Sequence, residues 1–199
     1  VTAKRVVVKV GSSSISGENV HKIDKIVDAL GAAHQRGQEV ILVTSGAIAT
    51  GLPLLGLEVK PDDLATSQAL ASVGQGRLIS RYQQSLERYG IIAGQVLLTA
   101  QDLEGEETTI NAKRAMERLL ELRVIPIVNE NDTVATAEIR FGDNDRLGAL
   151  VAVLIDADAL ILLSDVDALY DMPPTKAGAK RIERIAYGQD ISEDRKSVV

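Results

Sequence analysis

Short apolar runs alternate with longer amphipathic stretches along most of this chain, and this alternation constrains its fold more than any other feature. Five runs read as buried strands: 6–10, 40–43, 91–98, 124–128 and 159–163. Stretches with apolar residues every three or four positions lie between them and read as helices: about 19–36, 62–89, 109–122 and 143–155. Alternation of this kind predicts a mostly parallel sheet with helices on both of its faces.

Several finer features of the same pattern can be predicted. Gly74 and Gly76 predict a break within the second helix, because glycine is a poor helix former. In the third helix, the spacing places four apolar side chains inward: Ile110, Met116, Leu119 and Leu120. The alternation over 133–140 is typical of a short hairpin.

Composition excludes several classes of protein. The net charge is −6, aromatic residues make up 3% of the chain, and Lys and Arg form no basic stripe, so nucleic-acid binding is not expected. Cysteine is absent, which excludes disulfides, thiolate metal sites and cysteine nucleophiles. The first apolar run is too short for a signal sequence or a membrane span, so we expect a cytoplasmic protein.

Polar side chains crowd the point where the fourth strand ends. The segment 129–132 reads Asn-Glu-Asn-Asp, and 142–145 reads Gly-Asp-Asn-Asp at the start of a helix. Ligands bind at the carboxyl ends of strands in parallel sheets, so these blocks predict a site for a small, charged, amine-bearing molecule. Paired carboxylates two residues apart are weak evidence for a protein-held metal, and we predict none.

Three other strands also end in polar turns. Lys9 lies inside the first strand, just before the Gly11-Ser12-Ser13-Ser14 turn, whose backbone N–H groups could receive an anion. Ser45 follows the second strand, and Ser164-Asp165 follows the fifth. Each has an ordinary structural alternative: a lysine reaching solvent, a helix cap, or a turn. No Walker A sequence occurs.

Taken together, these segments resemble the amino-acid kinase family, and within it the branch whose members phosphorylate glutamate. The resemblance runs from about residue 5 to 187 and is carried by six segments: 9–12, 43–49, 71–76, 94–99, 128–132 and 142–145. The pair of blocks at 129–132 and 142–145 is specific to this branch.

The resemblance implies a three-layer α/β/α sandwich that transfers the γ-phosphoryl group of ATP, with Mg²⁺, to the side-chain carboxylate of L-glutamate. This reaction is the first step of proline synthesis. The resemblance assigns the following roles: Lys9 and Asp145 catalytic, with Asp145 orienting the lysines; Ser45, Asp132 and Asn144 around glutamate; Lys9, Gly11, Ser164 and Asp165 around the nucleotide.

The resemblance also implies one kinase domain over 1–199, with a glutamate-binding part at about 5–156 and the start of a nucleotide-binding part at 157–199. The family's glycine-rich loop, its second lysine, its last strands and a PUA domain would follow Val199, so we expect the chain to be incomplete at its C-terminus. Expected partners are proline as feedback inhibitor, further copies of the chain, and glutamyl-phosphate reductase downstream.

Two alternatives stay open at this point. The chain could be another kinase of the same fold, acting on aspartate, carbamate or acetylglutamate. It could also be a fragment that binds glutamate or proline without turnover.

Overall fold

The computed structural model describes residues 3–15, 17–99, 101–135, 144–164 and 168–186. The chain divides into two compact units, Val1–Leu163 and Ser164–Val199. The hairpin predicted over 133–140 lies outside the described residues from position 136 onward, and residues 132–134 form a turn.

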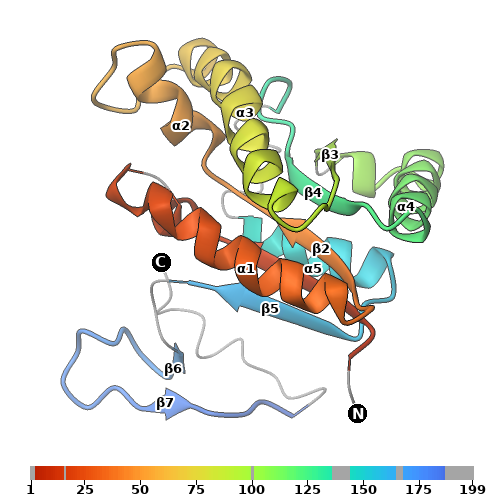
Figure 1. Ribbon diagram of the computed structural model, residues 1–199. Helices are drawn as coiled ribbons and strands as arrows, with labels where there is room; N and C mark the ends of the chain where they lie inside the picture. The colour runs from red at the N-terminus through yellow and green to blue at the C-terminus, as the bar shows by residue number, and fades with distance from the viewer. Residues whose placement is uncertain (1–2, 16, 100, 136–143, 165–167, 187–199) are drawn as a thin grey trace. The chain divides into compact units, whose positions relative to one another are not determined.

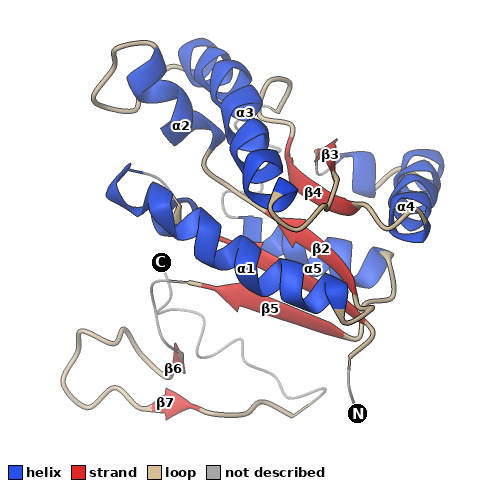
Figure 2. Ribbon diagram, in the orientation of Figure 1, coloured by secondary structure: helices blue, strands red, loops and turns tan. Residues whose placement is uncertain are grey.

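The first unit is built on a five-stranded sheet with the order β3-β4-β2-β1-β5 (Figure 1, Figure 2). Every pair of neighbouring strands in this sheet is parallel. The strands are β1 (Arg5–Val10), β2 (Glu39–Val43), β3 (Ala93–Leu98), β4 (Ile125–Glu130) and β5 (Ala159–Leu163). In the register, Lys9 pairs with Val43 and Val43 pairs with Val128, so β1, β2 and β4 end at the same level.

Within the described residues, five α-helices connect or follow these strands: α1 (Lys22–Gln35), α2 (Ala47–Leu54), α3 (Leu64–Glu87), α4 (Glu106–Glu121) and α5 (Asn144–Leu154). Short 3₁₀ turns cover Ser12–Ser14, Gly17–His21 and Gln101–Leu103. In the second unit, β6 (Leu169–Tyr170) and β7 (Arg181–Ile182) form an antiparallel pair.

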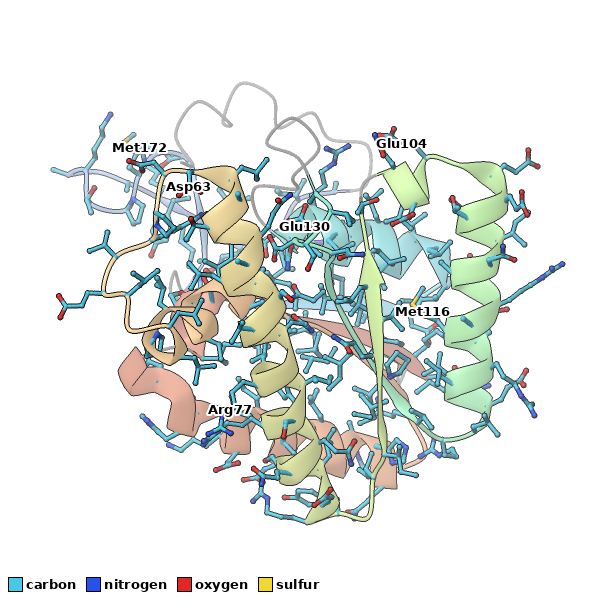
Figure 3. The ribbon with its side chains drawn as sticks, turned by 90° about the horizontal axis from the view of Figure 1, so that it is seen from above. Asp63, Arg77, Glu104, Met116, Glu130 and Met172 are labelled. Atoms are coloured by element: carbon cyan, nitrogen blue, oxygen red, sulfur yellow. The ribbon has the colours of Figure 1, made fainter. Side chains whose placement is uncertain are left out.

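The sheet is covered on both faces, as the alternation of strands and helices predicts. On one face, the even-numbered valines of β1 pack with Leu30 of α1 and Tyr82 of α3. On the other face, Val7 packs with α4 and α5, and the Met116 side chain points from α4 toward the sheet (Figure 3). The three-layer α/β/α arrangement is therefore confirmed for the first unit. The period of two along β1 also places Lys9 on the α5 face, with Val7.

The predicted break in the second helix is wrong, because α3 runs without interruption from Leu64 to Glu87. The glycine at position 74 serves close packing: a Cβ there would lie 1.9 Å from the Ala47 carbonyl oxygen of α2. Gly51 of α2 makes the reciprocal approach, with a Cβ position 2.2 Å from the Leu70 carbonyl oxygen. Contact between the two backbones outweighs the poor helix propensity of glycine.

The inward placement of Ile110 is also wrong, while that of Met116 and Leu120 is confirmed. Ile110 is 42% exposed, whereas Met116 and Leu120 are 0% and 4% exposed. Ile110 lies in the second turn of α4, which begins at Glu106. Helical spacing identifies the apolar stripe, but it does not show how far along that stripe the sheet reaches.

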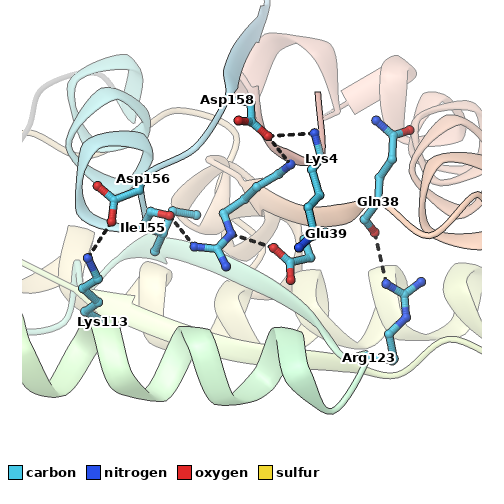
Figure 4. Close-up of polar contacts among 9 residues, drawn as sticks. Lys4, Gln38, Glu39, Lys113, Arg123, Ile155, Asp156 and Asp158 are labelled. Carbon is cyan, nitrogen blue, oxygen red and sulfur yellow. Dashed lines mark hydrogen bonds and ion pairs between the residues drawn. The ribbon is translucent and has the colours of Figure 1, made fainter. Parts of the chain in front are cut away.

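Polar contacts fix the opposite end of the sheet, where the strands begin (Figure 4). The Asp158 carboxylate accepts hydrogen bonds from the backbone N–H groups of Arg5 and Lys4, at 2.8 and 2.7 Å. These two bonds lower the pKa of Asp158. The Arg5 side chain pairs with Glu39 at the start of β2 and donates to the carbonyl oxygen of Ile155, which follows α5. The start of β1 is thereby joined to β2 and to the segment before β5.

Candidate active site

The Lys9 side chain is buried where β1 ends, and it reaches the first turn of α5. Lys9 is 4% exposed, and its Nζ lies 2.5 Å from Asp145 Oδ1. Gly148 follows Asp145 by three positions and so lies on the same face of α5. A Cβ at Gly148 would lie only 3.3 Å from Lys9 Cβ, so this glycine leaves room for the lysine stem. The lysine is therefore held in place, and snorkelling into solvent is excluded.

The turns that follow β1 and β2 lie against each other. Gly46 precedes α2 with φ +97°, a left-handed conformation that favours glycine. A Cβ added at Gly46 would lie 3.6 Å from Ser12 Cα, which measures how closely the two turns approach. Gly11 lies close to the end of the lysine side chain, because a Cβ at Gly11 would be 3.6 Å from Lys9 Nζ. Ser45, half-buried, precedes Gly46 at this meeting point.

A network of buried amides connects the end of β4 to α5 and α3. Asn144 Nδ2 donates to the Thr44 carbonyl oxygen at 2.6 Å and to Asn129 Oδ1 at 2.8 Å. Asn129 Oδ1 also accepts the backbone N–H of Glu130, and Asn129 Nδ2 donates to Gln75 Oε1 at 2.7 Å. Buried amides in one chain of bonds hold one another in fixed orientations.

The Tyr82 side chain contacts Thr44, a residue of this network. The hydroxyl of Tyr82 lies 3.1 Å from Thr44 Oγ1, and Thr44 Oγ1 donates to the Ser45 carbonyl oxygen. Burial raises the pKa of Tyr82 to about 12, so this side chain stays neutral at physiological pH. A neutral phenol can donate to Thr44, which fixes the residue whose carbonyl oxygen receives Asn144.

A small hollow opens beside the network, at the end of β4 and the N-terminal half of α3. It is lined by Ala47, Ala71, Gln75, Leu97, Glu130, Asn131, Asp132 and Thr133. Figure 3 labels Glu130 at this end of β4, beside α3. The carboxylates of the hollow favour a ligand that carries an amine.

Comparisons with known proteins agree with this geometry. Residues 4–198 match the amino acid kinase family. The glutamate 5-kinase of Clavibacter sepedonicus is 67% identical over 190 residues, which cover 96% of this chain and 73% of the relative. The chain belongs to the amino acid kinase family, in its glutamate 5-kinase branch.

Two further glutamate 5-kinases illustrate the spread of this branch. The protein of Leifsonia xyli subsp. xyli is 66% identical over 190 residues, covering 96% of this chain and 70% of the relative. That of Salinispora arenicola is 55% identical over 194 residues, covering 96% of this chain and 53% of the relative. High identity therefore extends over nearly the whole chain in all three comparisons.

Most of the site residues predicted from the sequence gather at one end of the sheet in this amino acid kinase. Six of them belong to the first unit, where they lie near the end of a strand or at the start of a helix: Lys9, Gly11, Ser45, Asp132, Asn144 and Asp145. Asp132 lines the hollow, whereas Asn144 lies within the amide network, where its side-chain N–H groups donate to Thr44 and Asn129. Ser164 is exposed and belongs to the second unit, and Asp165 lies outside the described residues.

Sequence reasoning gave no role to Gln75, although it lies in a segment that carries the family resemblance. It occupies a buried position on α3 between two glycines, where a polar side chain needs a reason. Its partner Asn129 is 54 residues away along the chain. A polar residue on the buried stripe of a helix is a signal that could have found it.

Two features are absent from the residues that the structure describes. Among them, no group of three or more His, Cys, Asp or Glu side chains is placed to hold a metal ion. None of the helices seen in these residues is long and apolar enough to cross a membrane.

Proposed function

We propose that the chain transfers the γ-phosphoryl group of ATP to the side-chain carboxylate of L-glutamate, forming L-glutamyl 5-phosphate, the first step of proline biosynthesis. The observation that carries this proposal is the 67% identity to a glutamate 5-kinase over 96% of the chain. The geometry adds a fixed lysine and an acid-lined hollow at the same end of the sheet.

The chemistry suits a site without a general base. A glutamate carboxylate has an ordinary pKa near 4.3 and is ionised at neutral pH. One of its oxygens attacks the γ-phosphorus, the bond from that phosphorus to the β–γ bridging oxygen breaks, and ADP leaves. The obstacle is repulsion between two anions, so catalysis consists of positioning and charge stabilisation. The ammonium of Lys9 supplies positive charge at the transferring phosphoryl group, and the ion pair with Asp145 holds this ammonium in position.

The nucleotide side of the proposed site begins at the β1 turn. Backbone N–H groups around Gly11 would bind phosphate oxygens next to Lys9, and Ser164 and Asp165 would contact the nucleotide. Mg²⁺ bound with ATP would supply further positive charge at the phosphates. No residue of this chain is assigned to the metal.

The substrate side of the proposed site is the acid-lined hollow. Asp132, half-buried in its wall, would pair with the ammonium of glutamate. Ser45 and Asn144 complete the proposed surroundings of the substrate, and both lie within the turns and amide bonds that join β2, β4 and α5. Amides and hydroxyls can approach a carboxylate without adding repulsion.

Asp132→Asn tests the assignment of the ammonium site. The substitution removes the charge and keeps the shape, so we expect the KM for glutamate to rise by one to two orders of magnitude. A charge-assisted hydrogen bond contributes about 1.5–3 kcal/mol, which sets this range. The KM for ATP should change little. Asp62→Asn, at an exposed position before α3, is the matched control. An unchanged KM for glutamate in Asp132→Asn would remove this residue from the site.

We also propose that proline inhibits by competing with glutamate, because the two share α-amino and α-carboxylate groups. Calorimetric titration with proline should give an apparent Kd about tenfold higher when glutamate is present at ten times its own Kd, by mass action. Proline binding that is indifferent to glutamate would place the inhibitor at a separate site.

The proposed function is tested directly by ADP release with glutamate, compared with aspartate, carbamate and acetylglutamate. Release that depends on glutamate alone supports it, and a preference for another acceptor would overturn it. Glutamate binding without ADP release would identify a binding protein instead. The acyl phosphate product hydrolyses readily, so we propose that it is passed to glutamyl-phosphate reductase in the cytoplasm. We also propose that the kinase assembles from several copies of the chain.

A further inference from the structure

We infer that Gln75 is a substrate-binding residue whose side-chain N–H group recognises the α-carboxylate of glutamate and so sets acceptor specificity. This inference rests on the proposed function and deepens it. It follows from the directions of the hydrogen bonds around one buried amide.

Two backbone groups fix the direction of every bond in the amide network. The Thr44 carbonyl oxygen can only accept, so the atom of Asn144 that faces it must be the N–H₂ group. The backbone N–H of Glu130 can only donate, so the atom of Asn129 that faces it must be Oδ1. Asn144 then donates to Asn129 Oδ1, in agreement with both constraints.

The orientation of Asn129 in turn determines the orientation of the Gln75 side chain on α3. With its oxygen committed, Asn129 presents Nδ2 to Gln75, and the atom of Gln75 that receives this bond at 2.7 Å must be Oε1. Gln75 Nε2 is consequently turned away from Asn129. Rotating the amide by half a turn would set one N–H₂ group against another, so the orientation of Gln75 is imposed by β2 and β4.

The outward Nε2 group has no hydrogen-bond partner in the part of the chain that the structure describes. Gln75 is 9% exposed and contributes to the wall of the hollow. A buried N–H₂ group without a partner is costly, so in a native protein it calls for a specific explanation, such as a ligand that binds there. Gln75 Nε2 is therefore a hydrogen-bond donor that is available to an oxygen atom of a ligand in the hollow.

The chemistry of the hollow identifies that oxygen. Asp132 in the same wall attracts an ammonium group, so a donor beside it would meet the other charged group of an amino acid head, its α-carboxylate. Lys9 is not part of this wall, and the reacting side-chain carboxylate must approach Lys9 and the phosphates. The α-carboxylate is thus the acceptor left for Gln75. A neutral donor can bind it in a wall that already carries Glu130 and Asp132.

Gln75→Glu separates the two halves of this amide. A glutamate side chain keeps an oxygen for Asn129 Nδ2, but it has no N–H to offer the ligand. We expect calorimetry to show the Kd for L-glutamate raised at least about tenfold, as expected for loss of a charge-assisted hydrogen bond. The α-amide of glutamate, which can donate to the new carboxylate, should lose little affinity. The preference for glutamate over its α-amide therefore falls, and a purely structural role would lower both affinities alike.

Two further variants complete the design. Gln84→Glu makes the same change at an exposed position of α3 and should bind glutamate as the parent chain does. Gln75→Met is uncharged and removes the donor, so it should also weaken glutamate binding more than binding of the α-amide. Gln75→Met decides the matter if Gln75→Glu fails to fold, as judged by circular dichroism.

The outcomes distinguish this inference from the proposed function. Binding of glutamate by the parent chain without ADP release would overturn the function, while the variants would still test Gln75. An unchanged ratio of the two affinities in both Gln75 variants, with ADP release intact in the parent chain, would overturn the inference alone.

Discussion

Lys9→Met should lower kcat by two to three orders of magnitude and change the Kd for glutamate little. Methionine preserves the length of the buried stem beside Gly148, so the fold should survive. The lost ammonium acts mainly when charge redistributes at the transferring phosphoryl group, and removal of one such stabilising group costs about 2.7–4 kcal/mol in the transition state. Rapid-quench or ADP-release kinetics would measure kcat, and calorimetry would measure the Kd.

Lys113→Met is the matched control for this experiment. Lys113 forms an exposed ion pair with Asp156, at the end of the sheet where the strands begin (Figure 4). Exposed ion pairs contribute about 0–1 kcal/mol to stability, so neither folding nor turnover should change appreciably. Normal kcat in a well-folded Lys9→Met variant would show that the buried lysine has only a structural part.

Gly74→Ala should destabilise the protein by roughly 3 kcal/mol or more, the upper end of the range for overpacking. The added methyl would lie 1.9 Å from a carbonyl oxygen of α2 and 2.6 Å from the backbone nitrogen of Gly51. Backbone atoms cannot rotate out of the way, so α2 and α3 must separate. In a chain of this size each kcal/mol corresponds to about 2–4 °C in Tm, which differential scanning calorimetry resolves. Glutamate affinity should fall as well, since Ala47 of α2 lines the hollow.

Gly76→Ala tests the explanation on the same helix. A Cβ at Gly76 meets nothing within 4 Å, so alanine there only improves helix propensity. We expect a gain of about 0.5–1 kcal/mol in the free energy of unfolding. If Gly74→Ala were as stable as the parent chain, the close approach of α2 and α3 would be wrong.

These two glycines also show where sequence reasoning stopped short. The strands were predicted to within a few residues because each one is a short apolar run closed by glycine or by polar residues. Glycine within a helix, however, signals either a break or a close contact, and only the position of α2 decides between them. Propensity is a local quantity, whereas the contact at Gly74 joins segments more than twenty residues apart.

The candidate site divides in the same way. Lys9, Asp132 and Asp145 could be proposed as site residues from the sequence, because they lie at the ends of apolar strands or at the start of a helix, in segments that resemble the amino acid kinase family. The role that we infer for Gln75 could not be proposed from the sequence, because it depends on the direction of hydrogen bonds that pass through Asn129 and Asn144. Sequence gives the residues of such a network but not the polarity of its bonds.

The amide network also has a consequence for how the protein matures. Its bonds join residues 15, 54 and 100 positions apart, so no single strand–helix unit can form it alone. Long-range contacts of this kind close only after most of the chain entropy has been lost, late in folding. A partly folded chain in which β4 has not yet joined the sheet would lack the Asn129 contact that orients Gln75, and by our inference it would discriminate poorly among amino acids. Glutamate would then select chains in which the whole sheet is assembled, and its binding energy would stabilise that sheet as one cooperative unit.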